Sequence, residues 1–146
     1  MTDDEKKQKI CGYIGDICKD KCKRDTLYIT DSYIFPNSYR LEYKTWLISI
    51  FKELSYKNIV VILNENKCNN TLFIEIKNEL SRDNINIEIK HFNGIHDRFW
   101  ISNFKKGIIM GTSLNGIGAK LCYIDTLKDD DVTLIVDYLK ENNLLN

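Results

Sequence analysis

Apolar residues recur along the chain with two different periods, which divide it into predicted helices and strands. A spacing of three or four residues predicts amphipathic helices over residues 3–22, 40–56, 69–82 and 129–142. Short β-rich, continuous or alternating apolar runs predict strands over residues 26–30, 58–63, 85–91, 99–101, 108–110 and 121–124. The run at 58–63 is apolar throughout, which is typical of a strand covered on both faces.

The order of these elements predicts the fold class. Strands alternate with helices as far as residue 91, and a hairpin, a further strand and a last helix follow. This order predicts an α/β fold, with a mixed β-sheet flanked by helices on both faces. The chain has no internal repeat or linker, so we expect one domain over residues 1–146. Its leading helix, within residues 1–24, could instead be a connector if the chain was cut from something longer.

Composition and charge narrow the possible partners. Hydrophobic residues make up 43% of the chain and charged residues 29%, which is typical of a globular protein. Basic and acidic residues number 21 each, so any surface that attracts a polyanion has to be local. No apolar run approaches the roughly 18 residues of a membrane span. The charged N-terminus lacks the apolar stretch of a signal peptide, so we expect a cytoplasmic protein.

The five cysteines do not predict a disulfide framework, because their number is odd and no secretion signal precedes them. Cys18 and Cys22 lie one turn apart on the first predicted helix and could form half of a zinc site. The chain has only two histidines, His91 and His96, and offers no second ligand pair at the required spacing. We therefore expect free thiols, with no metal and no cofactor.

The residues with the most chemical potential follow the third predicted strand. His96 and Arg98 are two positions apart, so in an extended segment their side chains point to the same face. A guanidinium can bind two phosphate oxygens while an imidazole reaches the phosphorus or a leaving oxygen. The glycine-rich segment 111–118 adds small residues and backbone N–H groups of the kind that surround anions. These residues predict a phosphate site.

At these positions the sequence resembles the phospholipase D superfamily, whose motif reads H-x-K-x4-D followed by G-S-x-N. His96-Asp97-Arg98 stands in place of H-x-K, and Ser113-Leu114-Asn115 matches S-x-N, with Gly111 just ahead. Arginine replaces the family's lysine, Asn103 stands where the aspartate falls, and the spacer to S-x-N is two residues longer. The H-D-R form is similar to the phospholipase D-like domain at the C-terminus of microtubule-interacting-and-trafficking proteins.

The resemblance implies roles for five residues. His96 would be the nucleophile that attacks phosphorus, while Arg98, Ser113 and Asn115 would hold phosphate oxygens. Asp125 could be the acid that orients His96. Two copies of the motif meet across a two-fold axis in the family, so a chain with one motif would act as a homodimer.

Three functions remain open at this stage. The first is a metal-independent phosphodiesterase, or nuclease, that acts as a homodimer through His96. The second is a non-catalytic phospholipase D-like module that binds a protein partner, nucleic acid or a phosphorylated head group. The third is a small structural or regulatory protein with a vestigial site.

Two of the candidate features also have purely structural interpretations. His96 could be a structural histidine that bonds to Asp31 or Asp125. The segment 31–33 follows the first predicted strand, where site residues often lie, but it could equally be a turn that ends the strand.

Overall fold

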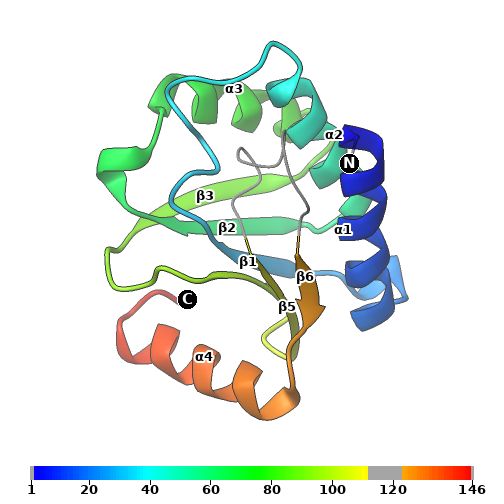
Figure 1. Cartoon of the computed structure of the whole chain (residues 1–146), viewed down its shortest axis with the longest axis vertical. Coiled ribbons are helices and arrows are strands. Elements are labelled where there is room, and N and C mark those ends of the chain that lie inside the picture. Colours follow the sequence, from blue (N-terminus) through cyan, green and yellow to red (C-terminus); the bar gives the residue numbers. More distant parts are fainter. Residues whose placement is uncertain (1, 112–122, 146) are drawn as a thin grey trace.

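The computed structural model describes residues 2–111 and 123–145, and in them a six-stranded mixed sheet forms the centre of the fold (Figure 1). The strand order is β3-β2-β1-β4-β5-β6. The strands are β1 (Thr26–Thr30), β2 (Asn58–Leu63), β3 (Asn86–His91), β4 (Arg98–Ser102), β5 (Lys106–Met110) and β6 (Ile124–Thr126). The predicted mixed sheet is therefore confirmed.

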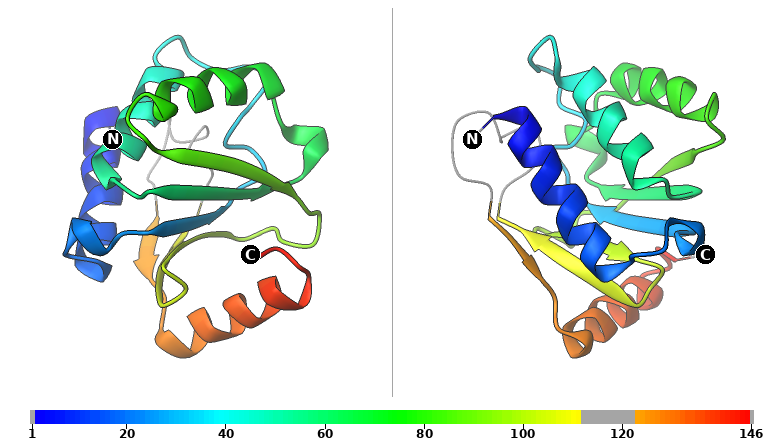
Figure 2. Two further views of the ribbon diagram at one scale, coloured as in Figure 1. Left: turned by 180° about the vertical axis from the view of Figure 1, so that it is seen from behind. Right: turned by 90° about the vertical axis from the view of Figure 1, so that its right-hand side faces the viewer.

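Helices cover both faces of this sheet, as predicted. Figure 2 shows helices on both sides of the sheet. One side carries α1 (Asp3–Ile17), α2 (Tyr43–Leu54) and α3 (Asn70–Ser81), and the other carries α4 (Asp129–Glu141). None of the helices in the described ranges is long and apolar enough to cross a membrane.

The strand directions decide which ends of the strands meet. β1, β2 and β3 are parallel and are joined through α2 and α3, whereas β4 pairs with β1 in the antiparallel direction. The carboxyl ends of the three parallel strands therefore meet the start of β4 at one edge of the sheet. In open α/β sheets, ligands bind at this kind of edge, where the order of the strands reverses.

The core consists of two layers, one on each face of the sheet. The layer under α1, α2 and α3 is the larger and includes the fully buried Trp100 and Phe51. On the other face, Val132, Val136 and Leu139 of α4 pack against sheet residues such as Tyr28. Alternate residues of β4 serve the two layers, as the two-residue period of a strand requires.

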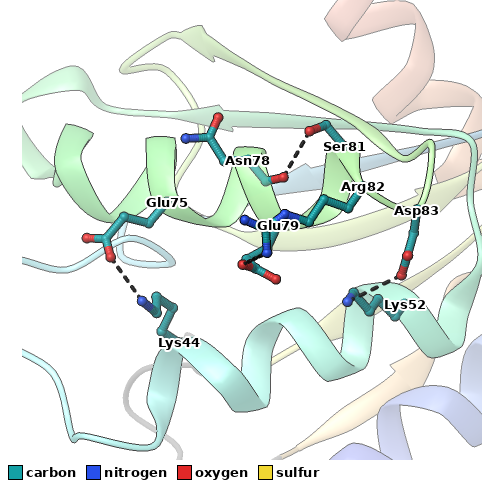
Figure 3. Close-up of polar contacts among 8 residues, drawn as sticks. All are labelled: Lys44, Lys52, Glu75, Asn78, Glu79, Ser81, Arg82 and Asp83. Carbon is teal, nitrogen blue, oxygen red and sulfur yellow. Dashed lines mark hydrogen bonds and ion pairs between the residues drawn. The ribbon is translucent and has the colours of Figure 1, made fainter.

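Ion pairs connect α2 with α3 and with the residues that follow it along their exposed sides (Figure 3). Lys44 of α2 donates to Glu75 of α3 at 2.9 Å, and Lys52 lies 3.3 Å from Asp83 just beyond α3. All four side chains are substantially exposed, so each pair contributes only about 0–1 kcal/mol to stability. The apolar layer beneath holds the helices in place.

Three predicted boundaries were wrong. α1 ends at Ile17 rather than at 22, because Cys18 leaves the helical conformation and a short 3-10 helix follows at Lys21–Lys23. α2 begins at Tyr43 rather than at 40, since Leu41 lies in the preceding loop and is 90% exposed. The last strand is Ile124–Thr126; of the predicted range 121–124, residues 121 and 122 lie outside the described residues.

Candidate functional site

A cavity of about 240 Å³ lies at the edge of the sheet where the parallel strands end and β4 begins. The segments that follow β1 and β2, the connection from β3 to β4, and the first residue of β4 all line it. Its polar lining residues are Asp31, Ser32, Tyr33, Asn64, Lys67, Asn93, His96, Asp97 and Arg98. The predicted pair His96 and Arg98 therefore lies in one cavity.

Hydrogen bonds from β1 fix the start of β4. The Thr30 hydroxyl donates to the backbone carbonyl of Asp97 at 2.7 Å and accepts from the backbone N–H of Phe99 at 2.8 Å. These two bonds hold the residues on either side of Arg98. The position of the Arg98 backbone at the cavity is thus set by the last residue of β1.

Side-chain hydrogen bonds also fix the segment that follows β1. The Asp31 carboxylate accepts from the backbone N–H of Tyr33 at 2.9 Å, which makes a tight turn. The Ser32 hydroxyl accepts from the backbone N–H of Asn64 at 3.1 Å and so ties the ends of β1 and β2 together. The proposed turn at 31–33 therefore exists, and it also lines the cavity.

The N–H groups of the Arg98 guanidinium donate no hydrogen bond to another described residue. Its Nε lies 3.9 Å from Oδ1 of Asp31, a long contact for an ion pair, and this Nε is buried with no hydrogen-bond acceptor among the described residues. The Asp31 side chain is 2% exposed and that of Arg98 is 26% exposed. A guanidinium that lines a cavity and lacks hydrogen-bond acceptors among the described residues is suited to bind an anion.

His96 reaches the cavity in a different way from the one predicted. It lies in the connection before β4 rather than on the strand, so its alignment with Arg98 does not come from strand periodicity. Its side chain is exposed, and within the described residues its imidazole makes no hydrogen bond or ion pair. The alternative of a structural histidine bonded to Asp31 or Asp125 is thus not seen.

Asp125 lies elsewhere. It is in the middle of β6, two strands away from β4, and its register partner Ile109 is in turn paired with Phe99. Asp125 and Phe99 thus share one face of the sheet, whereas Arg98 points to the other.

The Asp125 carboxylate accepts from the Tyr123 hydroxyl at 3.2 Å and from the Thr126 backbone N–H at 2.8 Å. It does not line the cavity, so Asp31 is the acid nearest to Arg98.

Ser113 and Asn115, the two other predicted phosphate ligands, lie outside the described residues. The nearest described residues on either side of them are Gly111 and Tyr123. The backbone N–H of Gly111 donates to the carbonyl of Tyr123 at 2.8 Å. Both flanking residues lie at the same edge of the sheet as the cavity, because Arg98, Met110 and Ile124 are in register across β4, β5 and β6.

Asn103, at the position of the family's aspartate, has a structural role here. It lies in the tight turn between β4 and β5 with a positive φ of 53°. Its carboxamide oxygen accepts from the backbone N–H groups of Asp25 and Thr26, and its Nδ2 donates to the carbonyl of Lys23 at 2.7 Å. Asn103 therefore fastens the hairpin to the start of β1, at the far end of β4 from Arg98.

Sequence reasoning missed Lys67 and Asn64, which line the cavity together with Asn93 from the segment that contains His96. Lys67 brings a second cation, and its Nζ lies 5.9 Å from the centre of the Tyr33 ring. The sequence does contain a pattern that could have pointed to them. A polar run over residues 64–67 starts directly after the buried strand β2, and ligands of α/β sheets bind where such strands end.

Within residues 2–111 and 123–145, no group of three or more His, Cys, Asp or Glu side chains could hold a metal ion. Cys18 and Cys22 are both free thiols, like Cys11 and Cys68. Cys122 lies outside the described residues.

A scan against protein-family models finds no match for this chain, and a search of curated proteins finds none either.

Proposed function

We propose that the cavity binds the phosphate group of a phosphodiester, with Arg98 as the principal ligand. The observation that carries this proposal is the guanidinium itself: the Arg98 side chain lines the cavity and is 26% exposed, and within the described residues its N–H groups have no hydrogen-bond acceptor, since Oδ1 of Asp31 is 3.9 Å from its Nε. Lys67 and His96 line the same cavity and supply further donors. A guanidinium that can bind two oxygens at once matches the geometry of a phosphate.

The charges around the cavity favour a diester over a monoester. Two cations, Arg98 and Lys67, are balanced by the carboxylates of Asp31 and Asp97. A phosphodiester carries one negative charge, whereas a phosphomonoester carries nearly two at neutral pH. The buried Asp31 carboxylate repels a doubly charged phosphomonoester about twice as strongly as a singly charged phosphodiester, so the chemical class that fits is a phosphodiester such as nucleic acid.

Binding of a labelled single-stranded oligonucleotide in EDTA tests this proposal. Arg98→Ala should weaken binding roughly tenfold or more, because charge-assisted hydrogen bonds to the phosphate are lost. The slope of log affinity against log salt should also become shallower by about one. Arg82→Ala removes the same charge from a side chain that is 72% exposed on the outer side of α3, and it should have little effect. Equal losses in both variants would refute the proposal.

A second candidate is hydrolysis, and the observation in its favour is that the His96 imidazole is exposed and unengaged within the described residues. In this mechanism, a His96 nitrogen attacks phosphorus and forms a P–N bond while the P–O bond to the leaving group breaks. His96 of a second copy would donate a proton to the leaving oxygen, and water would then release the phosphate from the first.

Binding is supported better than hydrolysis, because no carboxylate in the described ranges orients the His96 imidazole. Incubation of DNA with the protein in EDTA separates the two. If no cleavage occurs, or if cleavage persists unchanged in His96→Ala, the hydrolytic candidate falls and the binding proposal stands. If cleavage depends on His96, sedimentation should show a homodimer.

A further inference from the structure

A second cavity, of about 320 Å³, lies directly beside the first. It shares Ile95, His96 and Asp97 with the first cavity, and its other lining residues come from the connection between β3 and β4, from β4 and from α4. We call it the apolar groove, defined by Gly94, Phe99, Leu134, Ile135 and Tyr138 together with the three shared residues. One short segment of chain, 95–97, therefore separates a charged cavity from an apolar one.

The apolar groove exposes large side chains. Leu134 and Tyr138 lie one turn apart on the same side of α4 and are 67% and 41% exposed. Tyr138 packs edge-on against Phe92, with ring centroids 6.2 Å apart. Gly94 is needed for this arrangement, because a Cβ there would lie 2.5 Å from the Phe92 ring and 2.9 Å from the Tyr138 hydroxyl. The loop before β4 therefore packs closely against the Tyr138 ring of α4.

We propose that the apolar groove takes the base of a nucleotide whose phosphate lies in the cavity beside it, so that the ligand is single-stranded nucleic acid. This inference rests on the proposed function. A nucleotide joins an anionic group to a planar ring with an apolar face, and the two adjoining cavities offer one environment for each. Aromatic side chains bind bases of any sequence by stacking, whereas a duplex keeps its bases paired and inaccessible.

Two 12-residue probes with the same backbone test this inference: single-stranded oligo(dT) and an abasic strand of equal charge. The wild-type protein should bind oligo(dT) roughly tenfold more tightly, since stacking on an aromatic residue is worth about that factor per base. Tyr138→Ser and Leu134→Ser should each reduce this preference and leave the affinity for the abasic strand unchanged. Ile74→Ser is the matched control, because it replaces a 53% exposed apolar residue on α3. It should change neither affinity.

The possible failures are distinguishable. If the wild-type protein binds both strands equally and Arg98→Ala weakens both, the base inference is overturned while the phosphate proposal stands. If neither strand binds, both fall. Binding to vesicles of phosphatidylserine and phosphatidylcholine that Leu134→Ser abolishes, without a preference for oligo(dT), would assign the groove to a lipid and overturn the inference.

Discussion

At the scale of single residues, we expect Asp31 to limit how strongly the site attracts an anion. Its carboxylate is 2% exposed and lies 3.9 Å from the Arg98 guanidinium, so it offsets part of the positive charge that a phosphate would meet. It also holds the turn after β1 through the backbone N–H of Tyr33. These two roles can be separated, because asparagine retains a side-chain oxygen acceptor and loses the charge.

We predict that Asp31→Asn increases the affinity for a phosphodiester by about tenfold to a hundredfold. At the effective dielectric near a protein surface, a negative charge roughly 6 Å from a phosphate would oppose its binding by roughly 1–3 kcal/mol. Fluorescence anisotropy with a single-stranded oligonucleotide measures the change. Asp16→Asn makes the same charge change at an exposed position of α1 and should alter affinity far less. An affinity that falls in Asp31→Asn would show that Asp31 positions Arg98 rather than opposing the ligand.

Cys11 provides a second test at the residue scale. Burial raises the pKa of the Cys11 thiol to about 12, and the hydrogen bond and charge of Glu53 add to this effect. At pH 8 only about one Cys11 in ten thousand is then a thiolate, the reactive form. We predict that iodoacetamide labels the exposed Cys22 at least about 100-fold faster than Cys11, as read by mass spectrometry. Glu53→Gln should accelerate labelling of Cys11, and similar rates for the two thiols in the folded wild-type protein would contradict the assignment.

At the scale of elements, one buried arginine joins the ends of two helices. Arg24 is 4% exposed; its Nε and Nη2 donate to the carbonyl of Cys18, the C-cap of α1. Its Nη1 donates to the carbonyl of Leu54, the last residue of α2, at 2.8 Å. The carbonyls at a helix C-terminus carry a partial negative charge, so a cation there stabilises both helices.

We predict that Arg24→Ala lowers the free energy of unfolding by about 3–5 kcal/mol, because two helix-end carbonyls lose charged donors and one of these bonds is buried. Arg24→Lys should recover only part of this loss, since an ammonium lacks the planar fork of N–H groups. Urea unfolding followed by circular dichroism measures both. Arg40→Ala, which breaks a surface pair with Asp3, should cost less than about 1 kcal/mol. Comparable costs for Arg24→Ala and Arg40→Ala would contradict this role.

The strands were easier to predict than the helix ends. β1 to β4 lie within one residue of the predicted ranges, whereas β5 begins two residues earlier than predicted, because the turn of the hairpin is shorter than expected. Alternating and continuous apolar runs show which residues are buried, and the pattern of buried residues marks where a strand begins and ends. The end of α1 depends instead on Arg24, which binds the Cys18 carbonyl from six residues away. The start of α2 was misplaced because Leu41 fits the helical spacing but lies exposed in the loop.

At the scale of the whole molecule, the sequence located one part of the candidate site and missed another. His96 and Arg98 both line the cavity because they are close in sequence, although the strand periodicity from which this was predicted does not reach His96. Asp31 and Lys67 reach the cavity only because the parallel strands β1 and β2 end at the same edge, which is a consequence of topology. Asp125 lies in β6, which is the outermost strand on one side of the sheet. No local sequence pattern reveals which strand is outermost.

Alkaline titration tests the packing of the molecule as a whole, because tyrosines on both faces of the sheet are buried. Burial raises the pKa of Tyr43 well above its usual value of 10, and the charge of Asp31 adds to this effect. Burial likewise raises the pKa of Tyr56 and of Tyr28. The folded protein therefore keeps phenol protons that the unfolded chain releases above pH 10. Their contribution to stability is fully present below pH 10 and is lost as pH rises towards the folded-state pKa values.

We predict that stability declines as pH rises above about 10, with Tyr43 alone contributing about 1.4 kcal/mol for each pH unit. Phenolate absorbance at 295 nm should therefore rise together with the loss of helical circular dichroism, because these tyrosines ionise only as the fold opens. Tyr43→Phe retains the ring and should flatten the decline above pH 10. It should also cost stability at neutral pH, since the buried carbonyl of Ile34 loses the Tyr43 hydroxyl that donates to it at 2.6 Å. Full phenol ionisation in a chain that stays folded would show that these side chains are not packed in the core.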